Sequence, residues 1–300
     1  MTVDDRTLVI VGAPSSAGSY APGQELAPAV LREHGLVDRL RSRGITVTDA
    51  GDGPVQIWSP DDEHPLAQNL GDVVASVTAV AEKVGAALDD GADVLLLGGS
   101  CLVALGAMSA LVPRAPDASL LYIDRHSDLN TPQTTTDGAL DWMGLAHLLD
   151  VPGALPELRD ALGPAPLLTP EHVHLLGVVP SASTPGERRI RDALGLQMTV
   201  SDDLAHDPRA AAARALEALG PGPIVAHVDV DVLDFTDAPL AEDTGGRNTG
   251  PTLAALTEAL AMICRDPRFR ILSIGEFNPT RAVGAPEVID RLVDGIAHAL

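Results

Sequence analysis

The sequence predicts an α/β protein whose mainly parallel sheet of about eight strands carries helices on both faces. Apolar runs of strand length alternate with helical stretches along all 300 residues, a pattern typical of strand–helix–strand units. The hydrophobic content of 45% is enough to fill a substantial core. Two Pro/Gly-rich stretches, 151–170 and 238–251, are too short and too weakly charged to be domain linkers. We therefore expect one domain over residues 1–300, with these stretches as surface and active-site loops.

The individual elements follow from apolar periodicity. The expected strands lie at 8–11, 45–48, 93–97, 119–124, 172–178, 196–200, 224–231 and 270–275. A helix is expected from Ala27 to Arg43, with apolar residues at helical intervals and Gly44 as its stop. Further helices are expected at 72–88, 208–219 and 253–264.

Composition limits the class of partner. Acidic residues outnumber basic ones by 42 to 20, and this surplus disfavours nucleic acid and anionic membranes. No uncharged apolar run reaches the roughly 18 residues that a membrane-spanning helix needs. The start, MTVDDRTLVI, has neither a basic region nor a cleavable apolar stretch. We expect a cytoplasmic protein whose two cysteines, Cys101 and Cys264, stay reduced.

Two rows of metal-binding side chains follow apolar strands. The run LLYI leads into Asp124, His126 and Asp128, and PIVA leads into a similar row of one histidine and two aspartates. Alternation along an extended segment places the members of each row on one side. Parallel sheets bind ligands beyond the carboxyl ends of their strands. Buried carboxylates and imidazoles are costly without a cation, so the two rows indicate a site for Mn²⁺, Fe²⁺ or a related ion.

Five segments of the chain resemble the arginase (ureohydrolase) family, and together they extend over nearly its whole length. They are VGAPSSAGSYAPGQELAPAVLREHGL, LLLGGSC, DRHSDLNTPQTTTDGAL, HVDVDVLDFTDAPL and IGEFNP. The resemblance implies a three-layer α/β/α domain around an eight-stranded parallel sheet, the arginase fold. It also implies a two-manganese cluster that activates hydroxide to hydrolyse a small guanidino substrate. Because trimers and hexamers are common in this family, a homo-oligomer is expected.

The resemblance assigns ligands one by one. It implies that Asp124 and Asp229 bridge two metal ions, that His126 and Asp231 bind one of them, and that Asp128 binds the other. Such a pair of cations lowers the pKa of a shared water toward neutrality.

The expected catalytic residues are Asp128, Glu276 and Asp141. Glu276 matches the family carboxylate that orients the guanidinium. Asp141 stands where the family has a histidine that handles protons for the leaving amine. An aspartate can replace that histidine only if a dry, carboxylate-rich site raises its pKa; the other interpretation is a solvated loop acid.

One metal site departs from the family pattern. Where the family has Gly-Gly-Asp-His-Ser, this chain has GGSCL, so Cys101 replaces a histidine ligand. Thiolate is a soft donor that Mn²⁺ does not prefer, so one or two ions are expected, with this site weak or differently filled. An inert buried Cys101 is the alternative. His227, two residues before Asp229, is either a substitute ligand or, with more support, a hydrogen-bonded structural histidine.

The substrate-binding residues are partly retained. Asn130 and Thr135 match the arginase-type loop that contacts the α-amino-acid end of the substrate. The family's acidic contact to the α-amino group aligns near Thr184, and Asp137 or Asp243 is an electrostatic substitute for it. An α-amino acid substrate follows from this likeness.

Three functions are compatible with these motifs. The first is hydrolysis of arginine or a close analogue. The second is hydrolysis of Nω-hydroxy-L-arginine to hydroxyurea, because the change to Cys101 resembles the hydroxyarginine-hydrolase branch and an N-hydroxyl lowers guanidinium basicity. The third is a metal-binding pseudoenzyme, since a fold does not guarantee activity.

Overall fold

Eight parallel strands form one sheet in the computed structural model, which describes residues 7–300. The strands are β1 (Thr7–Ala13), β2 (Thr46–Asp52), β3 (Asp93–Gly98), β4 (Ser119–Ile123), β5 (Val173–Val178), β6 (Gln197–Val200), β7 (Ile224–Asp229) and β8 (Phe269–Gly275). Their order is β2-β1-β3-β8-β7-β4-β5-β6, with every pairing parallel. The predicted parallel sheet is confirmed, and each expected strand overlaps an observed one.

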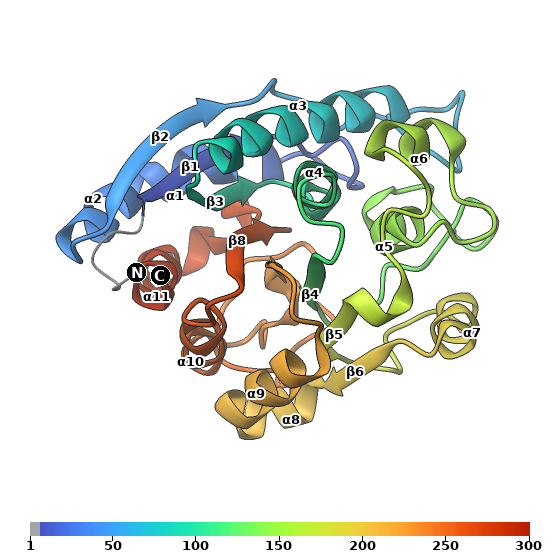
Figure 1. Ribbon diagram of the computed structural model, residues 1–300. Helices are drawn as coiled ribbons and strands as arrows, with labels where there is room; N and C mark the ends of the chain where they lie inside the picture. Colours follow the sequence, from blue (N-terminus) through green and yellow to red (C-terminus); the bar gives the residue numbers. More distant parts are fainter. Residues whose placement is uncertain (1–6) are drawn as a thin grey trace.

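Helices cover both faces of this sheet (Figure 1). They are α1 (Ala27–Glu33), α2 (Leu36–Ser42), α3 (Leu70–Asp89), α4 (Val103–Leu111), α5 (Gly144–Leu148), α6 (Pro156–Leu162), α7 (Pro185–Leu194), α8 (Ser201–His206), α9 (Pro208–Ala218), α10 (Leu253–Ile263) and α11 (Glu287–Ala299).

Two apolar cores separate the layers. Neighbouring strand residues point to opposite faces, so Ile10 belongs to the core that includes residues of α1, α2 and α8 to α11, whereas Val11 belongs to the core that includes residues of α3 to α6. Both side chains are fully buried. A parallel sheet needs this covering on both sides, because its strands are apolar on both faces. The three-layer α/β/α architecture is therefore confirmed.

The helix expected from Ala27 to Arg43 was wrong as one element. It divides into α1 and α2 at Gly35, whose φ of 81° is left-handed. Glycine adopts this conformation without the Cβ clash that other residues meet. The apolar spacing continues across the break, so periodicity alone did not reveal it.

The candidate row at 124–128 lies in a turn beyond β4, whereas His227 and Asp229 of the second row are still within β7. β4 ends at Ile123 and β7 ends at Asp229, and Asp128 has a left-handed φ of 46°. The predicted alternation of side chains in an extended segment at 124–128 is thus replaced by a bend in the backbone. The side chains of His126 and Asp128 nevertheless line the cavity at the sheet edge. Aspartate favours such bends because its carboxylate accepts hydrogen bonds from the backbone two residues on.

The two Pro/Gly-rich stretches differ from each other. The stretch 151–170 was expected to be loop but contains α6, while 238–251 has neither helix nor strand. Among the described residues, no helix has both the length and the apolar character needed to span a bilayer. The expected lack of a leader concerns mainly residues 1–6, which lie outside the described residues.

Candidate metal centre and active site

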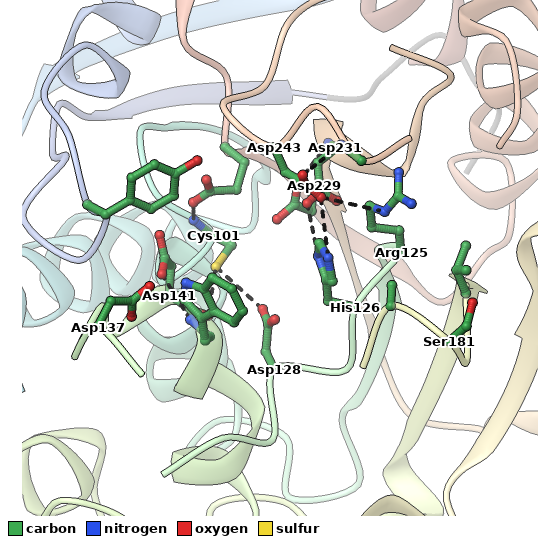
Figure 2. A pocket seen from close by; sticks show the side chains of 16 residues that line it. Cys101, Arg125, His126, Asp128, Asp137, Asp141, Ser181, Asp229, Asp231 and Asp243 are labelled. Atoms are coloured by element: carbon green, nitrogen blue, oxygen red, sulfur yellow. Dashed lines mark hydrogen bonds and ion pairs between the residues drawn. The ribbon is translucent and has the colours of Figure 1, made fainter. Parts of the chain in front are cut away.

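Four neighbouring central strands deliver the candidate site. In the order β3-β8-β7-β4, these strands end just before or at Cys101, Glu276, Asp229 and Asp124. Since all four run in the same direction, their carboxyl ends meet at one edge of the sheet, where open α/β sheets bind ligands. Residues far apart in sequence are thereby brought into one pocket (Figure 2).

The first group, which we call the histidine cluster, consists of Asp124, His126 and Asp231. One ligand atom from each lies within 4.8 Å of the others. His126 Nδ1 is 3.0 Å from Asp231 Oδ2 and 3.5 Å from Asp124 Oδ1. Asp124 is fully buried, yet Asp124 Oδ2 and Asp231 Oδ1 have no hydrogen-bond partner. Buried carboxylate oxygens without partners fit a divalent cation, which prefers oxygen and imidazole donors.

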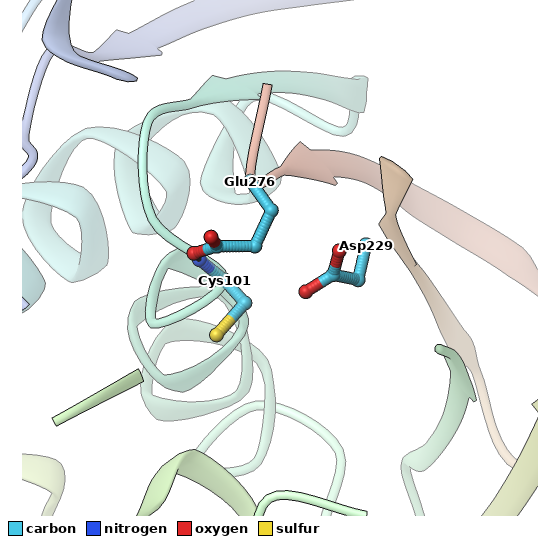
Figure 3. A group of neighbouring side chains, drawn as sticks. All are labelled: Cys101, Asp229 and Glu276. Atoms are coloured by element: carbon cyan, nitrogen blue, oxygen red, sulfur yellow. Dashed lines mark hydrogen bonds between the residues drawn. The ribbon is translucent and has the colours of Figure 1, made fainter. Parts of the chain in front are cut away.

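The second group, the cysteine cluster, consists of Cys101, Asp229 and Glu276, also within 4.8 Å of one another (Figure 3). Here the protein satisfies the carboxylate itself. Glu276 Oε1 accepts a 3.0 Å hydrogen bond from the Cys101 backbone N–H, and Oε2 accepts a 2.5 Å bond from Gln24 Nε2. Glu276 has a left-handed φ of 59°, and its backbone N–H donates to the Gly99 carbonyl at 2.7 Å.

Asp128 is adjacent to the cysteine cluster. Its Oδ2 accepts a 2.5 Å hydrogen bond from the Tyr122 hydroxyl and lies 3.5 Å from Cys101 Sγ. The sulfur also lies 3.3 Å from the Asp141 carbonyl oxygen. The Cys101 sulfur therefore faces the carboxylate of Asp128.

Burial and the crowding of carboxylates in the two clusters shift the pKa values of the side chains there. Burial first, and neighbouring carboxylates second, raise the pKa of Asp128, Asp229 and Asp141 well above the ordinary range. Burial raises the pKa of Glu276 to about 8. Burial works against a charged His126, but Asp231 and Asp124 raise the pKa of that imidazole. Carboxylates crowded in a dry site resist ionisation unless a cation joins them, so this donor set fits divalent metal.

His227 is separate from both clusters. Its Nδ1 lies 2.9 Å from Ser273 Oγ, and its ring stacks on Tyr122 with 4.9 Å between centroids. Burial lowers its pKa to about 4. These contacts are those of a structural histidine, although Nε2 has no hydrogen-bond partner.

The two clusters open into a cavity of about 570 Å³. Asp141, Trp142 and Asp137 line it, together with Tyr20 and the 238–251 loop residue Asp243. Asp141 is 6% exposed, and its Oδ1 accepts a 3.0 Å hydrogen bond from the Trp142 backbone N–H. Asp141 therefore has the dry, acidic surroundings that a proton-carrying role requires.

Three expected substrate contacts are not among the residues that line this cavity. Asn130 Oδ1 accepts 3.0 Å hydrogen bonds from both Thr134 Oγ1 and Thr184 Oγ1. Thr184 also caps α7 by accepting from the Glu187 backbone N–H at 3.1 Å. Thr135 Oγ1 donates to Asp137 Oδ1 at 3.2 Å. In this structure these side chains hold the loop, and Asp137 faces the cavity.

Some contacts were missed by sequence reasoning. Gln24 and Tyr122 hold cluster carboxylates, while Tyr20 and Arg125 line the cavity. Arg125 lies inside the DRHSD motif, between two metal-binding side chains, and this position was a usable signal. Gln24 gave no such signal, because only the fold brings it to Glu276, 252 positions away.

Comparison with known proteins identifies the family to which this fold and site belong. The model of the Arginase family matches residues 6–291. The chain belongs to the Arginase family. It is 30% identical to rat Arginase-1 over 98% of this chain and 91% of that protein. It is 31% identical to human Arginase-1 over 66% of this chain, and that match spans 61% of the human protein's length.

Solved structures of Arginase-family proteins share the fold. The chain superimposes on arginase from Bacillus subtilis with a TM-score of 0.87 and 24% identity, covering 99% of this chain and 98% of that one. Formimidoylglutamase from the same organism gives a TM-score of 0.73 at 19% identity, covering 100% of this chain and 86% of that one. At these identities the likeness extends to the fold and not to the substrate.

Proposed function

We propose that this Arginase-family chain is a metal-dependent amidinohydrolase that cleaves the guanidino C–N bond of arginine or a close analogue. The observation that carries the proposal is the histidine cluster, with its unpartnered buried oxygens, beside Glu276 in one cavity. We propose a single ureohydrolase-like domain, cytoplasmic and homo-oligomeric as a trimer or hexamer, without nucleic-acid or membrane partners. Family membership and the surplus of acidic residues support these last points.

The proposed metal ligands fall into two sets. Asp124, His126 and Asp231 would hold one Mn²⁺ ion, with Asp124 and Asp229 shared by both ions. Asp229, Asp128 and Cys101 would complete a second, weaker site, because a thiol is a poor donor for Mn²⁺. When bound, such ions supply the Lewis acidity that makes water a nucleophile near neutral pH.

Glu276 is proposed to orient the guanidinium. Gln24 and the Cys101 backbone N–H fix its two oxygens, and this preorganised carboxylate pairs with a planar cation. Asp141 is proposed to keep a proton in its acidic, dry surroundings and to donate it to the leaving amine.

The amino-acid end of the substrate is proposed to meet the loop that contains Asn130, Thr135 and Asp137, with Thr184 supporting it. Asp137 and Asp243 both line the cavity, and one of these two carboxylates is proposed to attract the α-amino group. Asn130, Thr135 and Thr184 position the loop through their hydrogen bonds.

The decisive experiment measures products and metal together. Purified protein is loaded with Mn²⁺, its metal content is determined, and urea, hydroxyurea and ornithine are measured from arginine and Nω-hydroxy-L-arginine. We expect metal-dependent turnover of a guanidine. Bound metal without turnover of either compound would overturn the proposal in favour of a pseudoenzyme, and hydroxyurea as the dominant product would favour the hydroxyarginine reaction.

A further inference from the structure

Arg125 is an exception to the charge of the cavity. It is the one lysine or arginine among the residues that line the cavity, whose wall includes Asp137, Asp141 and Asp231. Only 8% of its side chain is exposed. An arginine so deeply placed loses much of its hydration, which is costly unless its N–H groups find partners. The partners of the Arg125 N–H groups therefore indicate its role.

The protein leaves this guanidinium incompletely paired. Arg125 Nε is buried without a hydrogen-bond partner. Its ion pair is with Asp243 Oδ2 at 3.7 Å, beyond hydrogen-bonding distance, and Asp243 is 39% exposed and lies 3.5 Å from His126 Nε2. Gly246 packs tightly on the head group, since a Cβ at that position would lie 1.9 Å from Arg125 Nη1. The head group is thus held in place by packing, and its charge is only loosely paired within the protein.

Its position complements the acidic end of the cavity. In Figure 2, Cys101, Asp137 and Asp141 lie on one side, Arg125 and Ser181 lie on the other, and His126 and Asp231 lie between them. A ligand with a cationic group at one end and an anionic group at the other matches this arrangement. Arginine's planar fork is the side chain best suited to a carboxylate, which it binds through two parallel hydrogen bonds.

The residues expected to contact the amino-acid end of the substrate include no cation. Asn130 and Thr135 hydrogen-bond to other polar groups, Thr184 bonds to Asn130 from the start of α7, and none of the three is among the cavity-lining residues. We propose that Arg125 is a specificity-determining residue that binds the carboxylate of the guanidino substrate, with Ser181 as a neighbouring hydroxyl. This inference rests on the proposed function and narrows its substrate class to guanidino acids.

The test compares arginine with agmatine, its decarboxylated analogue, on the Mn²⁺-loaded protein. We expect Arg125→Gln to lower the ratio of kcat/KM for arginine to that for agmatine by about 10- to 100-fold, mainly through the KM for arginine. Arg125→Lys keeps the charge but not the fork, so it should restore part of the ratio. Metal content is measured for each variant, because Arg125 lies between Asp124 and His126.

Arg209→Gln, at an arginine whose side chain is 67% exposed and lies outside the cavity lining, is the matched control, and its ratio should equal the wild-type value. Equal losses for both substrates in Arg125→Gln would overturn the inference.

Failure of the proposed function is recognised separately. If the wild-type protein cleaves neither compound, the same ratio is taken from dissociation constants measured by calorimetry. Selective loss of arginine binding in Arg125→Gln then supports the carboxylate site without turnover. Equal binding of the two ligands by wild type and variant overturns it, and a wild-type protein that binds neither ligand overturns both proposals.

Discussion

The histidine cluster and the cysteine cluster lie at the same sheet edge but differ in how far the protein satisfies their atoms. In the histidine cluster, buried carboxylate oxygens of Asp124 and Asp231 have no partner. In the cysteine cluster, Gln24 and a backbone N–H occupy the oxygens of Glu276, and Tyr122 occupies neighbouring Asp128. A site that lacks partners depends on a cation, whereas a hydrogen-bonded site keeps its shape without one.

The largest expected effect is on the histidine cluster. Asp124→Asn removes a buried charge that both metal sets share, so we expect loss of bound Mn²⁺ and a fall in guanidine hydrolysis of about 1,000-fold, the equivalent of several kcal/mol. Metal analysis and the rise in Tm on Mn²⁺ addition are the measurements. The control is Asp160→Asn at an exposed ion pair. Full metal content in Asp124→Asn would contradict the statement that the histidine cluster depends on a cation.

The cysteine cluster should respond in the opposite direction. Cys101→His supplies a donor that Mn²⁺ prefers, so we expect about 10- to 100-fold tighter binding of a second ion and relatively more arginine cleavage. Calorimetric titration with Mn²⁺ measures this. Cys101→Ser, which removes the sulfur without adding an imidazole, is the matched control. If the metal stoichiometry and affinity of Cys101→His equal those of the wild type, residue 101 is outside the coordination sphere.

The Tyr122 hydroxyl tests whether hydrogen bonds replace a cation beside Cys101. Tyr122→Phe deprives buried Asp128 of its donor, which should lower the free energy of unfolding of the metal-free protein by about 1–3 kcal/mol. The loss should be smaller with Mn²⁺ present, because a cation then neutralises the carboxylate. Urea unfolding with and without Mn²⁺ gives both values. Tyr20→Phe, at a side chain 40% exposed, is the control, and equal losses in both metal states would contradict this account.

His174 sharpens the contrast, because it shows what burial alone does to an imidazole. Burial lowers its pKa from 6.5 to about 4, while carboxylates raise that of His126. The unfolded chain therefore takes up the proton first as pH falls, and His174 should reduce stability between pH 6.5 and 4, by at most about 1.4 kcal/mol per pH unit. Urea unfolding at several pH values should show a shallower slope in His174→Gln. An unchanged slope there, matching that of the exposed control His64→Gln, would refute it.

Much of the fold follows from local sequence patterns. The six inner strands are buried apolar runs and were visible as such, while the largely exposed edge strands β2 and β6 were visible from short β-branched or apolar segments beside turn residues. The break at Gly35 was not, because one glycine inside a helical pattern ends a helix only when packing requires it. The candidate metal-binding residues were also visible, since DRHSD follows β4 directly and HVDVD extends over the end of β7.

The remaining parts of the site depend on contacts between distant residues. The hydrogen bond from Tyr122 to Asp128 needs the bend at 124–128, with its left-handed Asp128. Likewise, Asn130 Oδ1 accepts a hydrogen bond from Thr184, 54 positions away, and this contact could not be read from the local sequence. Strand-end motifs indicate which residue types meet, but side-chain packing decides which of them face the cavity.

The place of β8 in the sheet determines when the site can form. The last strand of the chain lies between β3 and β7, so β2-β1-β3 and β7-β4-β5-β6 share no ladder until it is inserted. A chain emerging from the ribosome can complete the cysteine cluster only after Glu276 has been synthesised, whereas the histidine cluster draws on β4 and β7, which pair directly. Such long-range closure slows folding, because the entropy of a large loop is lost before the final contacts form. Completion of the cysteine cluster is therefore a late event for the nascent chain, coupled to the joining of the two halves of the sheet.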